Sequence, residues 1–194
     1  MLDQGLSRRR LIGGALALGS SMAIGATRAN ASFIVPGSEV GGIEKRLAIR
    51  SCHTNERYDA CYFRNGTYDP QGLAEIAHAL RDWRTGQAAP VDRELLDLLV
   101  TLRGRLDVDP RKPFDLISGY RSPHTNAALR AAGGEGTGVA TKSQHMLGKA
   151  TDIALPGVPL ARVKDAALAM ARGGVGYYPR DGFVHVDTGR VRSW

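Results

Sequence analysis

Two short strand-like segments constrain the fold of this chain most, because they carry histidine and aspartate at positions that have to meet. Residues 143–152 place His145 and Asp152 seven positions apart. Residues 183–187 place His185 between two valines, so strand alternation directs the histidine to one face and the valines to the other. Two imidazoles and one carboxylate are a ligand set of catalytic zinc, which leaves a fourth position for water. The pattern therefore predicts a fold that gathers His145, Asp152 and His185 around one zinc ion.

A buried hydrogen bond between His145 and Asp152, without any metal, is the alternative for these two residues. Three features favour the metal instead: Ser143 lies two positions before the histidine, Gly148 is small, and His185 supplies a third donor. Ser143 is also expected to contact substrate.

Several blocks occur in the order found in a known group of zinc peptidases. They are Ser118–Ser122, Ser143–Asp152, Gly173–Pro179 and Phe183–Asp187, with Trp194 at the end of the sequence. In these blocks the chain resembles the M15 group, which includes the D-Ala-D-Ala metallopeptidases. Within that group it is most similar to the small murein endopeptidases of the YcbK-like (DUF882) family.

The resemblance implies an α+β fold, with a small antiparallel sheet flanked by helices as in hedgehog and the D-Ala-D-Ala metallopeptidases. It implies one Zn²⁺ ion and hydrolysis of the peptide cross-links of bacterial peptidoglycan, whose peptide stems would be the partner. Two alternatives stay open: a carboxypeptidase of the D-Ala-D-Ala type, and a non-catalytic wall-binding module on the same fold.

The resemblance also suggests roles around the metal. In related enzymes the arginine that here is Arg121 holds a substrate carboxylate or carbonyl, so Arg121 and its neighbour Tyr120 are expected to contact substrate. A structural ion pair with Asp115 or with the C-terminus is the alternative for Arg121. Many M15 relatives carry an acid three positions before the last histidine, but that position is Gly182 here. Asp187 is then either the general base or a residue that orients a ligand imidazole, and the missing acid keeps the non-catalytic alternative open.

The first 31 residues predict a signal peptide of the twin-arginine type. The basic start Ser7–Ile12 leads into the apolar run Leu11–Ala26, and Ala29–Ala31 is a small-x-small cleavage site. A Sec signal and an uncleaved anchor are the alternatives. Residues 32–44 read as a flexible lead and residues 45–194 as a single zinc peptidase domain. We expect an exported monomer of the periplasm or cell envelope, without stable membrane insertion once the signal is removed.

Charge and cysteine content narrow the function further. The net charge is +7, but no dense stripe of Lys and Arg with interleaved aromatic residues is present, which argues against a nucleic-acid partner. Cys52 and Cys61 both lie in the exported part, and an even cysteine count in an exported chain predicts a disulfide between them. Two free thiols are the alternative.

Hydrophobic periodicity predicts alternating strands and helices. Strands are expected at 45–50, 58–64, 114–118, 150–154, 175–178 and 183–187, and helices from Asp69, from Pro90 or Asp92, from Pro123 and from Pro159. The apolar face of the first helix is expected to extend to Trp83.

Overall fold

A β-hairpin opens the fold and supplies one end of a large sheet. The computed structural model describes residues 44–133 and 140–194, which belong to one compact unit spanning Val40–Trp194. In the hairpin, β1 (Lys45–Ser51) pairs antiparallel with β2 (Arg57–Arg64), as the sequence predicts. The predicted signal peptide, and the flexible lead except for its last residue, lie outside the described residues.

The strands form one mixed sheet of eight strands among the described residues. The remaining strands are β3 (Thr67–Tyr68), β4 (Phe114–Ser118), β5 (Ala150–Ala154), β6 (Gly174–Tyr178), β7 (Phe183–Asp187) and β8 (Arg192–Ser193). Their order is β3-β2-β1-β4-β5-β7-β6-β8, and the pairs β1–β4 and β6–β8 are parallel. The α+β class is confirmed, but the expected small, antiparallel sheet is wrong. Periodicity identifies strands without identifying their neighbours, and two-residue strands carry no periodicity at all.

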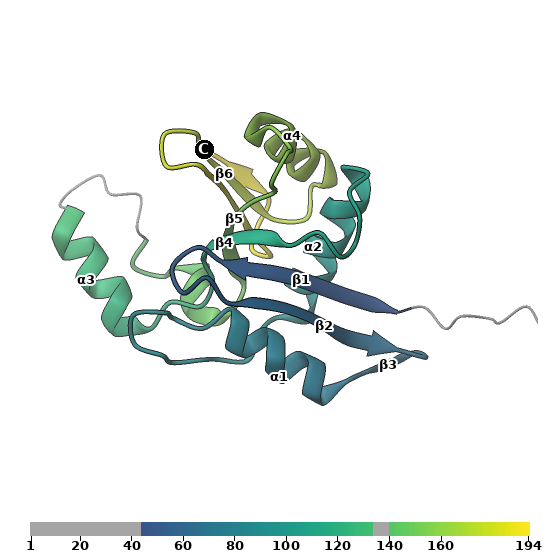
Figure 1. Cartoon of the computed structure of the whole chain (residues 1–194). Helices are drawn as coiled ribbons and strands as arrows, with labels where there is room; N and C mark the ends of the chain where they lie inside the picture. The colour runs from purple at the N-terminus through teal and green to yellow at the C-terminus, as the bar shows by residue number, and fades with distance from the viewer. Residues whose placement is uncertain (1–43, 134–139) are drawn as a thin grey trace, which may run out of the picture. The chain divides into compact units, whose positions relative to one another are not determined.

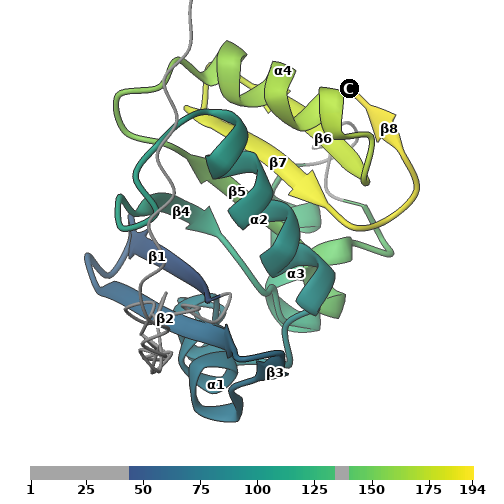
Figure 2. The ribbon, with the colours of Figure 1, turned by 90° about the vertical axis from the view of Figure 1, so that its right-hand side faces the viewer.

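Three helices share one hydrophobic core with one face of this sheet. They are α1 (Pro70–Ala79), α2 (Arg93–Arg105) and α4 (Leu160–Met170), and α2 and α4 lie side by side over the strands (Figure 2). The core joins Ile76, Leu99 and Val163 of the helices to Leu47 and Val184 of the sheet. None of the described helices has the length and apolar character needed to cross a membrane.

The helix starts follow the expected capping chemistry. The Asp69 carboxylate accepts hydrogen bonds from the backbone N–H groups of Gln71 and Gly72, and Asp92 accepts one from Glu94, so both helices begin where the sequence predicts. The end of α1 was not predicted correctly. The helix stops at Ala79, and Trp83 lies beyond it, 39% exposed and stacked on His53 rather than packed in the core.

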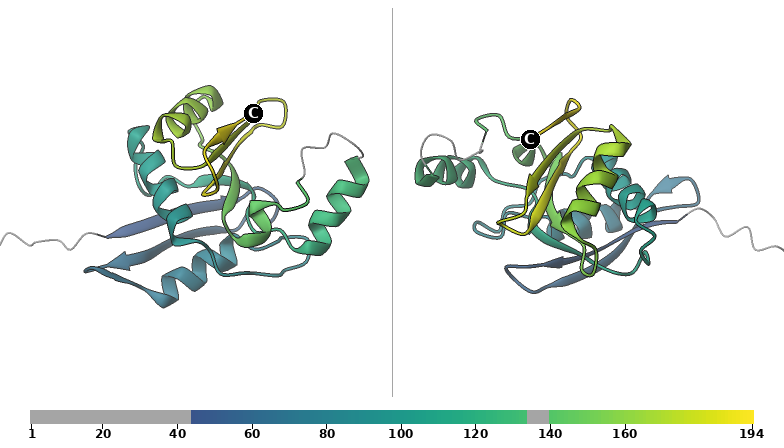
Figure 3. Two further views of the ribbon diagram at one scale, coloured as in Figure 1. Left: turned by 180° about the vertical axis from the view of Figure 1, so that it is seen from behind. Right: turned by 90° about the horizontal axis from the view of Figure 1, so that it is seen from above.

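Two further elements lie away from the three core helices. Helix α3 (Pro123–Gly133) extends away from the sheet (Figures 1 and 3). The short 3₁₀ turn η1 (Gln144–Leu147) leads into β5. Because Ile153 and Val184 occupy the helix-covered core, their neighbours Asp152 and His185 are directed to the opposite face of the sheet.

Candidate metal centre

The three predicted ligands meet on the face of the sheet opposite the core helices. His145 Nε2, Asp152 Oδ1 and His185 Nδ1 form a triangle with sides of 3.2, 3.3 and 2.8 Å. Ligands about 2.0–2.1 Å from a tetrahedral zinc ion lie about 3.3 Å from one another. The three donor atoms therefore fit a single small cation, and all three side chains are buried.

Strand register places two of these ligands beside each other. Asp152 of β5 and His185 of β7 are direct partners in the antiparallel pair, and Gly176 of β6 is the partner of His185 on the other side. The sheet therefore fixes the separation of Asp152 and His185 before any metal binds.

His145 is oriented by the turn that carries it. Ser143 caps η1, because its hydroxyl oxygen accepts a hydrogen bond from the His145 N–H at 3.3 Å. Gly148 ends the turn in the left-handed region at φ 65°, and a Cβ there would lie 2.3 Å from the Pro90 carbonyl oxygen. The ring Nδ1 lies 2.7 Å from the carbonyl oxygen of Gly119, which accepts only. This bond holds the proton on Nδ1 and leaves the Nε2 lone pair facing the donor triangle.

His185 is oriented by a buried carboxylate. Its Nε2 lies 2.9 Å from Asp187 Oδ2, so in the neutral ring the proton resides on Nε2 and the Nδ1 lone pair faces the other donors. Asp187 has no exposed surface and also accepts from Arg192 and from the backbone N–H groups of Gly174 and Gly189. Burial would lower the pKa of His185, but hydrogen bonds to Asp152 and Asp187 outweigh it and raise the pKa above its ordinary value.

The two carboxylates of the site remain ionised. Burial would raise the pKa of Asp152, but the charges and hydrogen bonds of His145 and His185 hold it well below its usual range. In Asp187 the hydrogen bonds from His185 and Arg192 likewise overcome burial and lower the pKa. Charged carboxylates, and imidazoles that release a proton when a metal binds, are the donor chemistry that a divalent cation needs.

A cavity of about 170 Å³ opens beside the donor triangle. One wall is aromatic and is formed by Tyr178, Phe183 and Trp194, and the rest is polar and largely basic, with Arg121, Lys142, Gln144 and Arg192. Among the described residues that line the cavity, Asp152 is the only acid.

Arg121 faces this cavity with unused hydrogen-bonding capacity. Its side chain is 11% exposed, its Nη2 lies 3.6 Å from Asp152 Oδ2, and its buried Nε has no partner among the described residues. Burial lowers its pKa, and the charge of Asp152 counteracts that shift. The alternative partner Asp115 instead forms two hydrogen bonds with Arg50. Arg121 is therefore available for a ligand in the cavity.

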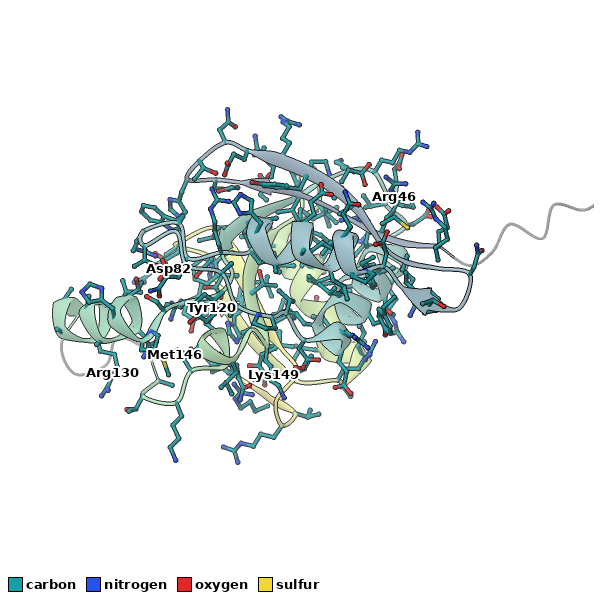
Figure 4. The ribbon with its side chains drawn as sticks, turned by 90° about the horizontal axis from the view of Figure 1, so that it is seen from below. Arg46, Asp82, Tyr120, Arg130, Met146 and Lys149 are labelled. Carbon is teal, nitrogen blue, oxygen red and sulfur yellow. The ribbon has the colours of Figure 1, made fainter. Side chains whose placement is uncertain are left out.

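The turn that carries Arg121 is built on a buried aspartate that the sequence did not reveal. Asp82 is 1% exposed and its Oδ2 accepts the backbone N–H of Ser122 at 2.9 Å, while the Tyr120 N–H donates to the Leu80 carbonyl. Figure 4 shows Asp82 and Tyr120 on neighbouring segments, with Met146 in η1 and Lys149 just after it. No motif or periodicity distinguishes Asp82 from a surface residue.

Three of the predicted site residues occupy other positions than expected. Tyr120 does not line the cavity, and the Ser143 hydroxyl, although at its edge, already caps η1. Asp187 lies behind His185 and does not line the cavity either. A general base has to reach the attacking water, so this position favours the orienting interpretation of Asp187 over the base interpretation.

The predicted disulfide is contradicted by the hairpin register. Cys52 and Cys61 are both free thiols. Cys61 pairs with Arg46, whereas Cys52 lies in the turn beyond Ser51, so about six residues of strand, or about 20 Å, separate the two positions. The disulfide prediction failed because an even number of cysteines does not show which residues face each other in the hairpin.

Comparison with known proteins agrees with this geometry. The model of the family Peptidase_M15_2, described as peptidoglycan L,D-endopeptidase MepK, matches residues 41–194. The chain is 42% identical over 189 residues to the peptidoglycan L,D-endopeptidase MepK of Escherichia coli K12, covering 97% of each chain. It is 38% identical over 148 residues to the probable MepK of Haemophilus influenzae, covering 76% of this chain and 77% of the relative. No solved structure shows a significant match. The chain belongs to the M15_2 family of peptidases.

Proposed function

We propose that this protein is a zinc-dependent murein endopeptidase that hydrolyses L,D peptide bonds in peptidoglycan cross-links. The observation that carries the proposal is the triangle of His145 Nε2, Asp152 Oδ1 and His185 Nδ1 at the wall of a cavity that also contains Arg121. The relatives' names supply the substrate and the L,D bond type.

The residues divide the work of the site. His145, Asp152 and His185 would hold the metal, which when bound supplies the Lewis acidity that activates water at neutral pH and polarises the scissile carbonyl. Arg121 would bind a carboxylate or the carbonyl oxygen of the substrate through the N–H groups of its guanidinium, which lines the cavity. Asp187 would keep His185 in the tautomer that donates from Nδ1.

The activity is tested by digesting purified sacculi with the native protein, with and without a chelator, while bound zinc is measured by elemental analysis. Dimeric muropeptides should be converted to monomers only when zinc is bound. When soluble dimers are offered separately, those with an L,D linkage should be cleaved. Those with a D,D linkage should remain intact. Cleavage of D,D dimers alone, or trimming of uncross-linked pentapeptides, would contradict the assigned bond.

A non-catalytic wall-binding module remains the second candidate. It is favoured by one observation: no acid other than the ligand Asp152 lines the cavity among the described residues, so they offer no separate carboxylate as base. A protein that binds zinc and sacculi but releases no product would establish this alternative. Its matched control is Asp152→Asn, which removes a ligand charge while preserving side-chain volume.

We also propose that residues 1–31 direct export by the twin-arginine route and that residues 45–194 work as a monomeric domain. Replacing Arg8 and Arg9 with Lys should leave the protein in the cytoplasm, as cell fractionation would detect. Retention of export would point to the ordinary secretory route.

A further inference from the structure

We propose that Tyr178 is a further catalytic residue, whose hydroxyl donates a hydrogen bond to the scissile carbonyl oxygen, and that Trp194 is the positioning residue that directs this hydroxyl. The inference rests on the proposed peptidase function and adds to it a donor to which the sequence analysis assigned no role. It begins with the aromatic wall of the cavity, which lies directly beside the ligand His185.

The hydrogen-bond direction at Tyr178 is fixed by chemistry. Trp194 Nε1 lies 2.6 Å from Tyr178 Oη, and an indole nitrogen can only donate. The phenol oxygen is therefore the acceptor, and its own proton has to be directed elsewhere. No described residue accepts that proton, and Tyr178 lines the cavity. Accepting one hydrogen bond also polarises the O–H and makes it a stronger donor.

Gly176 makes room for this arrangement next to the metal ligands. It is the strand partner of His185, and a Cβ at this position would lie 2.7 Å from Trp194 Cε2 and 2.8 Å from Tyr178 Cε2. Without a side chain there, the indole comes within 5.2 Å of the His185 ring, centroid to centroid. The absent side chain thus lets the Tyr178–Trp194 pair lie over β6 at the edge of the donor triangle.

The Tyr178 ring and the backbone of Trp194 are held in place. Tyr178 stacks on Phe183, with ring centroids 4.6 Å apart and planes at 22°. The backbone of Trp194 is fixed by two hydrogen bonds, from its N–H to the Val175 carbonyl and from the Tyr177 N–H to its own carbonyl. An immobilised donor needs little reorganisation during the reaction, which is the condition for effective charge stabilisation.

Few other donors in the cavity are free for this task. Arg192 is engaged by Asp187 through both terminal nitrogens. Lys142 is exposed at the rim. The Ser143 hydroxyl, which accepts the His145 N–H but keeps its own proton, and the Gln144 amide also line the cavity. Arg121 and Tyr178 are the two donors that we assign to the substrate.

The proposed step is balanced as follows. Water adds to the carbonyl carbon, a C–O bond forms, and the carbonyl π electron pair moves onto oxygen, which then accepts the Tyr178 O–H. The pair returns as the C–N bond breaks, and the departing amine nitrogen takes up the proton that water lost. Tyr178 keeps its proton throughout and only stabilises the charge.

The test is a double-mutant cycle on soluble L,D-linked muropeptide dimers, with zinc content measured for each variant. Tyr178→Phe removes only the hydroxyl and should lower kcat about 10²–10³-fold with little change in KM and full zinc content. Trp194→Phe removes the orienting N–H and should lower kcat by a smaller factor, about 10-fold. In the Tyr178→Phe background the same tryptophan change should cost nothing more, because its effect passes through the hydroxyl.

Tyr177→Phe is the matched control. Its ring lies next to Lys164, outside the cavity lining, so the same substitution one residue away should leave kcat unchanged. A Tyr178→Phe variant with native kcat, or additive losses in the double variant, would overturn the proposed roles while leaving the peptidase intact. A native protein that cleaves neither sacculi nor dimers would overturn the peptidase function, and the role of Tyr178 with it.

Discussion

Replacing Asp187 with Asn separates an orienting carboxylate from a catalytic base. The native carboxylate accepts hydrogen bonds from His185, from the Gly174 and Gly189 N–H groups, and twice from Arg192. An amide has one acceptor oxygen, and its NH₂ group would be turned towards groups that are themselves donors. About two donors would lose their partner, at about 1–3 kcal/mol each.

We therefore expect Asp187→Asn to lower the free energy of unfolding by about 3 kcal/mol, since the part-exposed Arg192 recovers some solvation. Loss of the bond that fixes the His185 tautomer should weaken zinc binding about 10–100-fold. Urea denaturation measures the first effect, and competition with a chromogenic chelator measures the second.

Asp181→Asn is the control for this change. Asp181 is exposed in the turn between β6 and β7, so its substitution should alter neither stability nor zinc affinity. If Asp187→Asn bound zinc as tightly as the native protein, kept its stability and yet lost turnover, the orienting role would be wrong. The base interpretation would then return despite the burial of Asp187.

Three further changes test other parts of the structure. Asp82→Ala leaves the buried N–H of Ser122 unpaired, so thermal unfolding should report a loss of about 1–3 kcal/mol together with reduced activity; an unchanged melting temperature would contradict this. Gly176→Ala should displace Trp194 and lower kcat, and a crystal structure with an unmoved indole would refute the packing argument. Cys52→Ser should leave stability unchanged. The protein of unchanged sequence, denatured without reductant, should react with a thiol reagent at two cysteines, whereas the absence of any reactive thiol would indicate a disulfide.

The sequence reveals the local elements of this fold better than their partners. Asp69 and Asp92 start helices because capping is a local interaction, and the strands at 114–118, 150–154 and 183–187 match their predicted bounds. Parallel pairing of β1 with β4 depends on contacts far apart in the chain, which periodicity does not report.

The candidate site shows the same division. Its three metal-facing side chains were predicted from spacing and resemblance, and the structure brings them together. Asp82 and Tyr178 were missed, because their roles depend on partners far away in the sequence, Ser122 across 40 positions and Trp194 across 16. The cysteine pair was misjudged because the number of cysteines carries no information about their positions along the hairpin.

Because β5 pairs with β7, the apolar face of the sheet determines where the metal ligands lie on the opposite face. A slip of one residue between these strands would turn the shifted strand over, so that either Asp152 or His185 would point inward and its neighbour, Ile153 or Val184, would be exposed to water. The alignment of the donors thus depends on aliphatic side chains that do not contact the metal. Replacing a coordinating residue should leave the strand pairing intact. Truncating the valine and isoleucine side chains behind the ligands should instead misalign a site whose ligands are all present.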